Sequence, residues 1–160
     1  MERGHAGDAV AGLIVIDTSA FVIDLRYKRD KDFSVNRAFL ERAAESRSAA
    51  TTIFNLLEVC GILSFNLNDR QLRELFHYFP QHYQVEVLPH ASLESSLPAC
   101  ATGDLFNTIL KKMSFGDALI AATIEKHVRG AECFVSWNAQ HFKGKLSIPC
   151  LNPRQFLKSH

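Results

Sequence analysis

The sequence predicts an α/β fold, a three-layer α/β/α sandwich around a mainly parallel sheet. Short runs of β-branched and aliphatic residues without polar alternation are typical of strands that a parallel sheet buries on both faces. These runs alternate with longer segments in which apolar residues recur every three or four positions, as in helices that cover a sheet. Because functional sites of such folds form beyond the carboxyl ends of the strands, we expect polar residues that follow strands to be informative.

Length and composition indicate one globular domain. The chain has 160 residues, enough for one sizeable core, and we expect a single domain over 1–160 with its core at about 13–152. Hydrophobic residues make up 47% and charged residues 22%, which excludes a disordered or collagen-like chain. The net charge of +1 excludes a global positive field, so a nucleic acid would need a local cationic patch.

The first predicted strand covers residues 13–17 and is aliphatic until it ends at Asp17. Thr18 and Ser19 can cap the helix that we predict over 20–26. A charged loop separates it from the next helix, at about 34–46.

The alternation continues to the end of the chain. Further strands are predicted at 49–52, 85–88, 133–136 and about 149–152. Further helices are predicted at 53–65, 70–79, 104–113 and 116–128. The helix over 70–79 is expected to stop at Pro80, which has no backbone N–H to continue it.

Asp17 is the most informative residue, because a carboxylate at the end of a buried strand is costly unless it is paired or bound to a cation. Capping of the following helix explains it equally well. Glu58 lies in a helical stripe with Phe54, Leu57 and Ile62, so we expect its side chain at or beside the packed face of that helix. An ion pair at the helix edge is the alternative for Glu58.

Asp117 begins the most apolar helix of the chain, and the helix dipole explains only part of its presence there. No basic residue lies within a helical turn of Asp17, Glu58 or Asp117. A hard divalent cation with oxygen ligands would satisfy all three, and Mg²⁺ or Mn²⁺ suits such a set.

Four segments occur in an order that resembles the PIN-domain family, especially the VapC-like toxins of toxin–antitoxin pairs. They are IVIDTSA at 14–20, NLLEV at 55–59, GDALIAA at 116–122 and SWNAQHF at 136–142. The resemblance covers about 13–152, and the combination of segments is more specific than any one of them.

The resemblance implies a PIN-like fold and a Mg²⁺- or Mn²⁺-dependent endoribonuclease. Asp17, Glu58 and Asp117 fall on the three acidic positions of the family and would be its metal ligands. Asn138 falls on a fourth position that is acidic in many members, so a second cation would be held less tightly. Together these four are the candidate catalytic residues.

Other residues are candidates for supporting roles. Thr18 and Ser136 would hydrogen-bond to the metal ligands, although both types are also common in turns and caps. Tyr27 or Trp137 could stack on a base, while Trp137 could instead belong to the core. His141 is expected to pack or hydrogen-bond rather than act as a general base. Cationic residues that could contact an RNA backbone, or could be solvated loop charges, are Arg26, Lys28, Arg29, Lys143 and Lys145.

The resemblance also implies partners, namely an RNA substrate, a cognate antitoxin protein and a second copy of the chain in a homodimer. No stretch of the sequence approaches the length of a membrane span, which needs about 20 consecutive apolar residues. The first apolar stretch is interrupted at Asp17, too early for a signal peptide, and the four cysteines lack metal-site spacing. We therefore expect a cytoplasmic protein with reduced cysteines.

Two other functions stay open. One keeps the same site but uses it in RNA processing or in DNA cleavage. The other is a non-catalytic module that binds RNA or protein, in which Asn138 marks a degenerate site.

Overall fold

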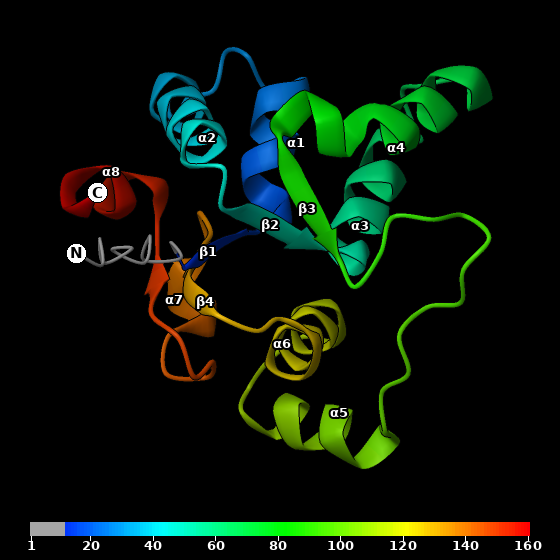
Figure 1. Cartoon of the computed structure of the whole chain (residues 1–160), viewed down its shortest axis with the longest axis vertical. Helices are drawn as coiled ribbons and strands as arrows, with labels where there is room; N and C mark the ends of the chain where they lie inside the picture. Colours follow the sequence, from blue (N-terminus) through cyan, green and yellow to red (C-terminus); the bar gives the residue numbers. More distant parts are fainter. Residues whose placement is uncertain (1–11) are drawn as a thin grey trace, which may run out of the picture.

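A five-stranded, all-parallel sheet is the centre of the computed structural model, which describes residues 12–160 (Figure 1). The strands are β1 Leu13–Ile16, β2 Ala49–Thr52, β3 Val85–Leu88, β4 Ala131–Val135 and β5 Cys150–Leu151. Their order in the sheet is β3-β2-β1-β4-β5, so the first strand of the chain is the central one. This sheet confirms the predicted α/β class.

Helices cover both faces of the sheet. The eight helices of the described residues are α1 Thr18–Arg26, α2 Phe33–Ser46, α3 Ile53–Leu63, α4 Asp69–Tyr83, α5 Thr102–Leu110, α6 Phe115–His127, α7 Ala139–Phe142 and α8 Pro153–Ser159. Core contacts place α1, α2, α3, α4 and α8 against one face, and α6 and α7 against the other, with α5 packed outside α6. Figure 1 shows α1 to α4 above the strands and α5 and α6 below them. The three-layer arrangement therefore also agrees with the prediction.

The strand β1 supplies side chains to both layers. Ile14 and Ile16 belong to the larger core, whereas Val15 belongs to the smaller one, because successive side chains of a strand point to opposite faces. All three are nearly or fully buried. This two-sided burial explains why the strand is aliphatic throughout.

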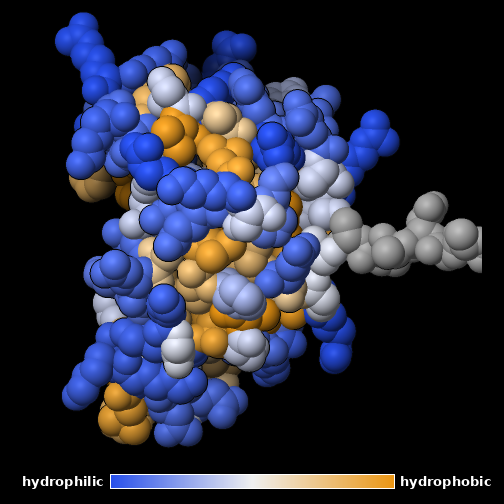
Figure 2. Space-filling view, turned by 90° about the vertical axis from the view of Figure 1, so that its left-hand side faces the viewer, coloured by the Kyte–Doolittle hydropathy of each residue, from blue (hydrophilic) through white to orange (hydrophobic). Residues whose placement is uncertain are grey.

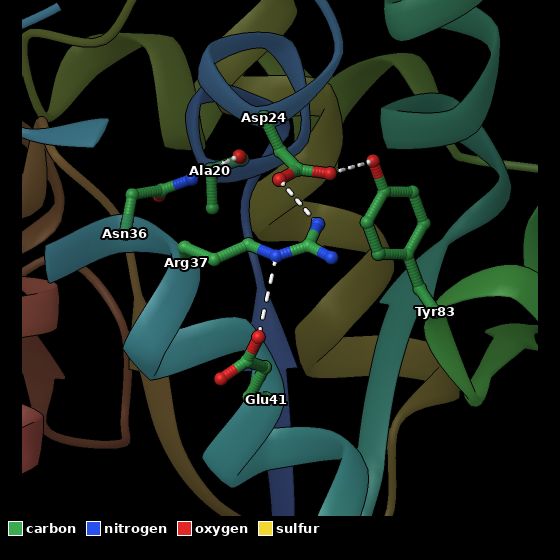
Figure 3. Close-up of polar contacts among 6 residues, drawn as sticks. All are labelled: Ala20, Asp24, Asn36, Arg37, Glu41 and Tyr83. Atoms are coloured by element: carbon green, nitrogen blue, oxygen red, sulfur yellow. Dashed lines mark hydrogen bonds and ion pairs between the residues drawn. The ribbon is translucent and has the colours of Figure 1, made fainter. Parts of the chain in front are cut away.

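A buried carboxylate joins α1, α2 and α4 (Figure 3). Asp24 of α1 accepts hydrogen bonds of 2.8 Å from Nη1 of Arg37 on α2 and from the hydroxyl of Tyr83 on α4. Arg37 also pairs through Nε with Glu41, one turn further along α2, at 3.3 Å. Because each oxygen of Asp24 has a donor, this charge is satisfied within the fold.

The prediction that Pro80 ends the fourth helix was wrong. The helix α4 continues through Pro80 to Tyr83. Phe79 and Tyr83 are buried against Phe21 of α1, with ring centroids 4.7 and 4.9 Å from that of Phe21. Burial of these rings offsets the hydrogen bond that a proline removes from a helix.

Two short helices near the C-terminus were not predicted. The helix α7 is a single turn after the fourth strand, and α8 follows the last strand. The start of α8 carries clear sequence signals, since Asn152 and Gln155 form a capping box around Pro153. Within residues 12–160, no helix is both long and apolar enough to span a membrane.

Candidate functional site

Asp17 lies at the carboxyl end of β1, with 5% of its surface exposed. It occupies the N-cap position of α1, but its side chain makes no capping hydrogen bond. Instead Oδ1 accepts from Nδ2 of Asn55 at 3.0 Å, and Oδ2 accepts from the hydroxyl of Ser136 at 2.6 Å. The capping explanation for Asp17 is therefore wrong.

Asn55 is a residue of the site that we did not predict from the sequence. It lies in the first turn of α3, where its Oδ1 accepts from the backbone N–H of Thr52 at 3.2 Å and from the Thr52 hydroxyl at 2.7 Å. This capping box fixes the amide, so its Nδ2 faces Asp17 and the hydroxyl of Thr18, each at 3.0 Å. The pattern Thr52-x-x-Asn55 was the available signal, since it is typical of a capped helix start.

Ser136 reaches Asp17 because β1 and β4 pair in register, with Ile16 opposite Val135. Its hydroxyl is fully buried, donates to Asp17 and accepts from the backbone N–H of Asn138 at 2.9 Å. The Ser136 side chain therefore contacts the candidate ligand directly, whereas the Thr18 side chain is linked to it through Asn55.

Glu58 lies beside the packed face of α3 and not on it, and its helical stripe is only partly buried. Leu57 and Ile62 of that stripe are each 37% exposed, and Glu58 itself is exposed. Leu56 and Val59, one position away, are the residues that are fully buried. Both stripes are apolar, so periodicity alone could not decide which one faces the sheet.

The Glu58 carboxylate lies near the start of α6. A Cβ built on Gly116 would be 3.6 Å from its Oε2. The next residue, Asp117, is half-buried in the first turn of α6, and its backbone N–H donates to the hydroxyl of Ser114 at 3.4 Å. Among residues 12–160, no Lys, Arg or His forms an ion pair with Asp17, Glu58 or Asp117. The ion pair that was the alternative explanation for Glu58 is therefore absent from these residues.

The pKa of Asp17 is raised from 3.8 to about 6, mainly because burial disfavours the charged form. Hydrogen bonds from Ser136 and from the backbone of Thr18 lower it, while the charges of Glu58 and Asp117 raise it further. Glu58 and Asp117 thus lie close enough to act on Asp17 electrostatically. No three His, Cys, Asp or Glu side chains of the described part of the chain lie close enough to hold a metal ion as they stand.

Asn138 is exposed directly after β4, in a segment anchored to the first two helices. The indole N–H of Trp137 donates to Oδ1 of Asn36 at 2.8 Å, and its backbone N–H donates to the hydroxyl of Ser19 at 3.1 Å. The Arg154 guanidinium lies 5.9 Å from the centre of the Trp137 ring. Trp137 is thus a half-buried anchor that holds Asn138 near Ser136.

The predicted RNA-contacting residues lie in two places. Arg26, Lys28 and Arg29 are exposed at the far end of α1, a nine-residue helix that spans about 13 Å from Asp17. Lys143 is exposed and lines the same cavity as Asn138, whereas Lys145 is half-buried and donates to the carbonyl of Lys112 at 3.0 Å. The first cluster is therefore a helix length from the carboxylates, and Lys143 lies nearer to Asn138.

No protein-family model matches the chain, and no curated protein matches it.

Proposed function

We propose that the chain is a Mg²⁺- or Mn²⁺-dependent endoribonuclease of the PIN kind, with Asp17, Glu58 and Asp117 as its metal ligands. The observation that carries this proposal is Asp17 itself. It is buried at the carboxyl edge of the sheet, two uncharged donors hold it, and its charged neighbours are two more carboxylates. A bound cation would offset the repulsion between these negative charges.

The residues fit such an ion by their chemistry, because carboxylate oxygens without a basic partner are the donors that hard divalent cations prefer. A bound divalent cation supplies the positive charge that a phosphodiester needs as negative charge develops on its oxygens. Asn55 and Ser136 hold the Asp17 carboxylate in one orientation, and the hydrogen bond from Ser136 lowers the pKa of Asp17 against the effect of burial.

The exposed Asn138 has a free side-chain amide at the edge of this site, and none of the residues 12–160 hydrogen-bonds to it. Its carbonyl oxygen can orient a water molecule for in-line attack on the phosphorus. Lys143 can neutralise a flanking phosphate of the RNA backbone. The chain itself thereby positions the nucleophile and the substrate.

The order of the four segments supports a toxin role in particular. We expect such a toxin to bind a cognate antitoxin, to form a homodimer and to be located in the cytoplasm. RNA processing or DNA cleavage would use the same carboxylates, and substrate tests separate these activities. A non-catalytic binding module is the second candidate, and the amide at Asn138 is the observation that favours it.

The test compares the wild type with Asp17→Asn and Asp117→Asn on a mixed RNA, with Mn²⁺ or with EDTA. We expect cleavage only by the wild type and only with Mn²⁺, and a melting temperature that Mn²⁺ raises in the wild type alone. Asp104→Asn is the matched control, because Asp104 is in the first turn of the neighbouring α5 and should retain full activity. Cleavage that persists in EDTA, or that the Asp17→Asn variant retains, would exclude these carboxylates as the active site.

A further inference from the structure

A polar cavity of about 270 Å³ lies beside Asn138, between α7, α8 and the end of β5. Its lining includes Trp137 and Asn138 after β4, Lys143 after α7, and Asn152 and Gln155 at the start of α8. We call this cavity the amide pocket. The two short helices lie at the left of Figure 1, on the side turned to the viewer in Figure 2, where hydrophilic residues frame a band of hydrophobic ones.

Two side chains of the amide pocket present hydrogen-bond donors in a fixed orientation. Oδ1 of Asn152 accepts from the backbone N–H of Gln155, and Oε1 of Gln155 accepts from the backbone N–H of Asn152, each at 2.8 Å. This reciprocal capping box occupies both carbonyl oxygens. The amide NH₂ groups remain, and neither donates to any other residue between 12 and 160. Lys143 adds further donors to the lining.

The amide pocket lies about two strand spacings from Asp17. The strands β1, β4 and β5 are consecutive in the sheet, and neighbouring strands are about 4.8 Å apart, so their carboxyl ends span about 10 Å. That distance is comparable with the one between a phosphate and the base of a neighbouring nucleotide. The volume is below the range of about 300 to 1,000 Å³ that drug-sized ligands occupy, which suits a single ring system.

We propose that the amide pocket binds one base of the RNA substrate and prefers a base with a carbonyl oxygen, such as uracil, over adenine. The inference rests on the proposed function. Donors fixed by a capping box require acceptors in the ligand, and the carbonyl oxygens of uracil, cytosine and guanine supply them. Adenine has an exocyclic amino group where uracil has the O4 carbonyl, so this group would face an amide NH₂ donor to donor, and only the ring nitrogens of adenine can accept. Trp137 adds an aromatic surface on which a base can stack.

The test uses the double variant Asn152→Asp and Gln155→Glu. Both substitutions keep the oxygen that accepts the capping hydrogen bond and replace the NH₂ donor with an acceptor, so α8 keeps its cap. The matched control is Asn68→Asp with Gln71→Glu, since these residues form the same capping box at the start of α4 and do not line the pocket. The control therefore adds the same two charges elsewhere.

The readout is the affinity of the whole chain for fluorescent hexanucleotides of uridine, of adenosine and of abasic ribose, measured by anisotropy in EDTA. We expect the wild type and the control to bind the uridine oligomer about 10-fold more tightly than the other two. The pocket variant should lose this ratio. Equal binding of the three oligomers by the wild type, or an equal loss of the ratio in the control, would overturn the inference.

This binding readout separates the inference from the proposed function. A uridine preference that the pocket variant abolishes, in a chain that cleaves no RNA, would support the pocket and contradict the nuclease. Metal-dependent cleavage without any base preference would support the nuclease and contradict the pocket.

Discussion

Asp17 carries the electrostatic cost of a buried carboxylate that lies close to two other carboxylates. Its pKa is about 6 in the folded protein, against an ordinary value of 3.8. Since the folded state binds this proton more tightly, protonation contributes stability that is fully present below pH 3.8 and lost as the pH rises through 6. The difference corresponds to about 3 kcal/mol in the metal-free protein at neutral pH.

The first prediction is that Asp17→Asn stabilises the metal-free protein at pH 7.5. The amide keeps a carbonyl oxygen for Asn55 and can donate to the Ser136 hydroxyl, while the buried charge is removed. We expect a gain of about 1 to 3 kcal/mol at pH 7.5 and a much smaller one at pH 4. Urea unfolding in EDTA at both pH values measures it. A gain that is equal at the two pH values would show that ionisation is not its cause.

Some residues of the candidate site were predictable and others were not. Asp17 stood out because a charge that ends an aliphatic strand breaks the pattern of a buried run. Asn55 did not stand out, because its role depends on which of its amide atoms the cap of α3 leaves free. Glu58 could be placed only at or beside the packed face of α3, since two adjacent stripes of this helix are both apolar.

At the scale of the elements, the contact of Asp24 with Arg37 and Tyr83 fixes how α1, α2 and α4 pack (Figure 3). Asp24 is buried, whereas the Arg37 side chain is 50% exposed. Solvent screens the ion pair on that side, so the hydroxyl of Tyr83 is the buried half of the interaction. Burial and the Asp24 carboxylate both raise the pKa of Tyr83, which therefore stays a donor.

The second prediction concerns that hydroxyl. Tyr83→Phe leaves one oxygen of a buried carboxylate without its donor, and we expect a loss of about 1 to 3 kcal/mol in the free energy of unfolding. Tyr78→Phe is the control on the same helix, because Tyr78 is 56% exposed and surface substitutions usually change stability by less than about 0.5 kcal/mol. Equal effects of both variants in urea unfolding would show that the Asp24 contact contributes nothing.

The elements themselves were largely predictable, but their ends were not. Aliphatic runs located the strands, and residue spacing located α1 to α6. Pro80 misled the prediction of the helix end because α4 is stabilised beyond it by the packing of Phe79 and Tyr83. Their partner, Phe21, is far away in the chain. A local rule for helix ends cannot include that contact.

For the whole molecule, the sequence predicted parallel strands but not their order. Nothing local indicates that β1 lies between β2 and β4, or that β5 forms an edge. Order follows from which apolar faces pack together, and the separation of Ile14 and Val15 into two cores is a property of the complete fold.

The third prediction uses the cysteines as a measure of that fold. Burial raises the pKa of Cys60 and Cys150 to about 11 and that of Cys133 to about 12, so these three thiols should not react at pH 8. Cys100 is only half-buried. We expect one iodoacetamide adduct by mass spectrometry in the native protein and four in urea, with Cys100→Ser removing the single adduct. A second native adduct would contradict the packing of the sheet.

The position of β4 has a consequence for the growing chain. Ser136 and Asp17 are 119 residues apart, yet they hydrogen-bond across the centre of the sheet. During synthesis on a ribosome, β1 emerges first and keeps one edge unpaired until β4 follows. A chain released before that point lacks the donor that holds Asp17 and exposes an aliphatic strand edge, which favours aggregation. Chains that stop before β4 are thereby expected to lack the complete set of contacts around Asp17, which forms only once Ser136 has been synthesised.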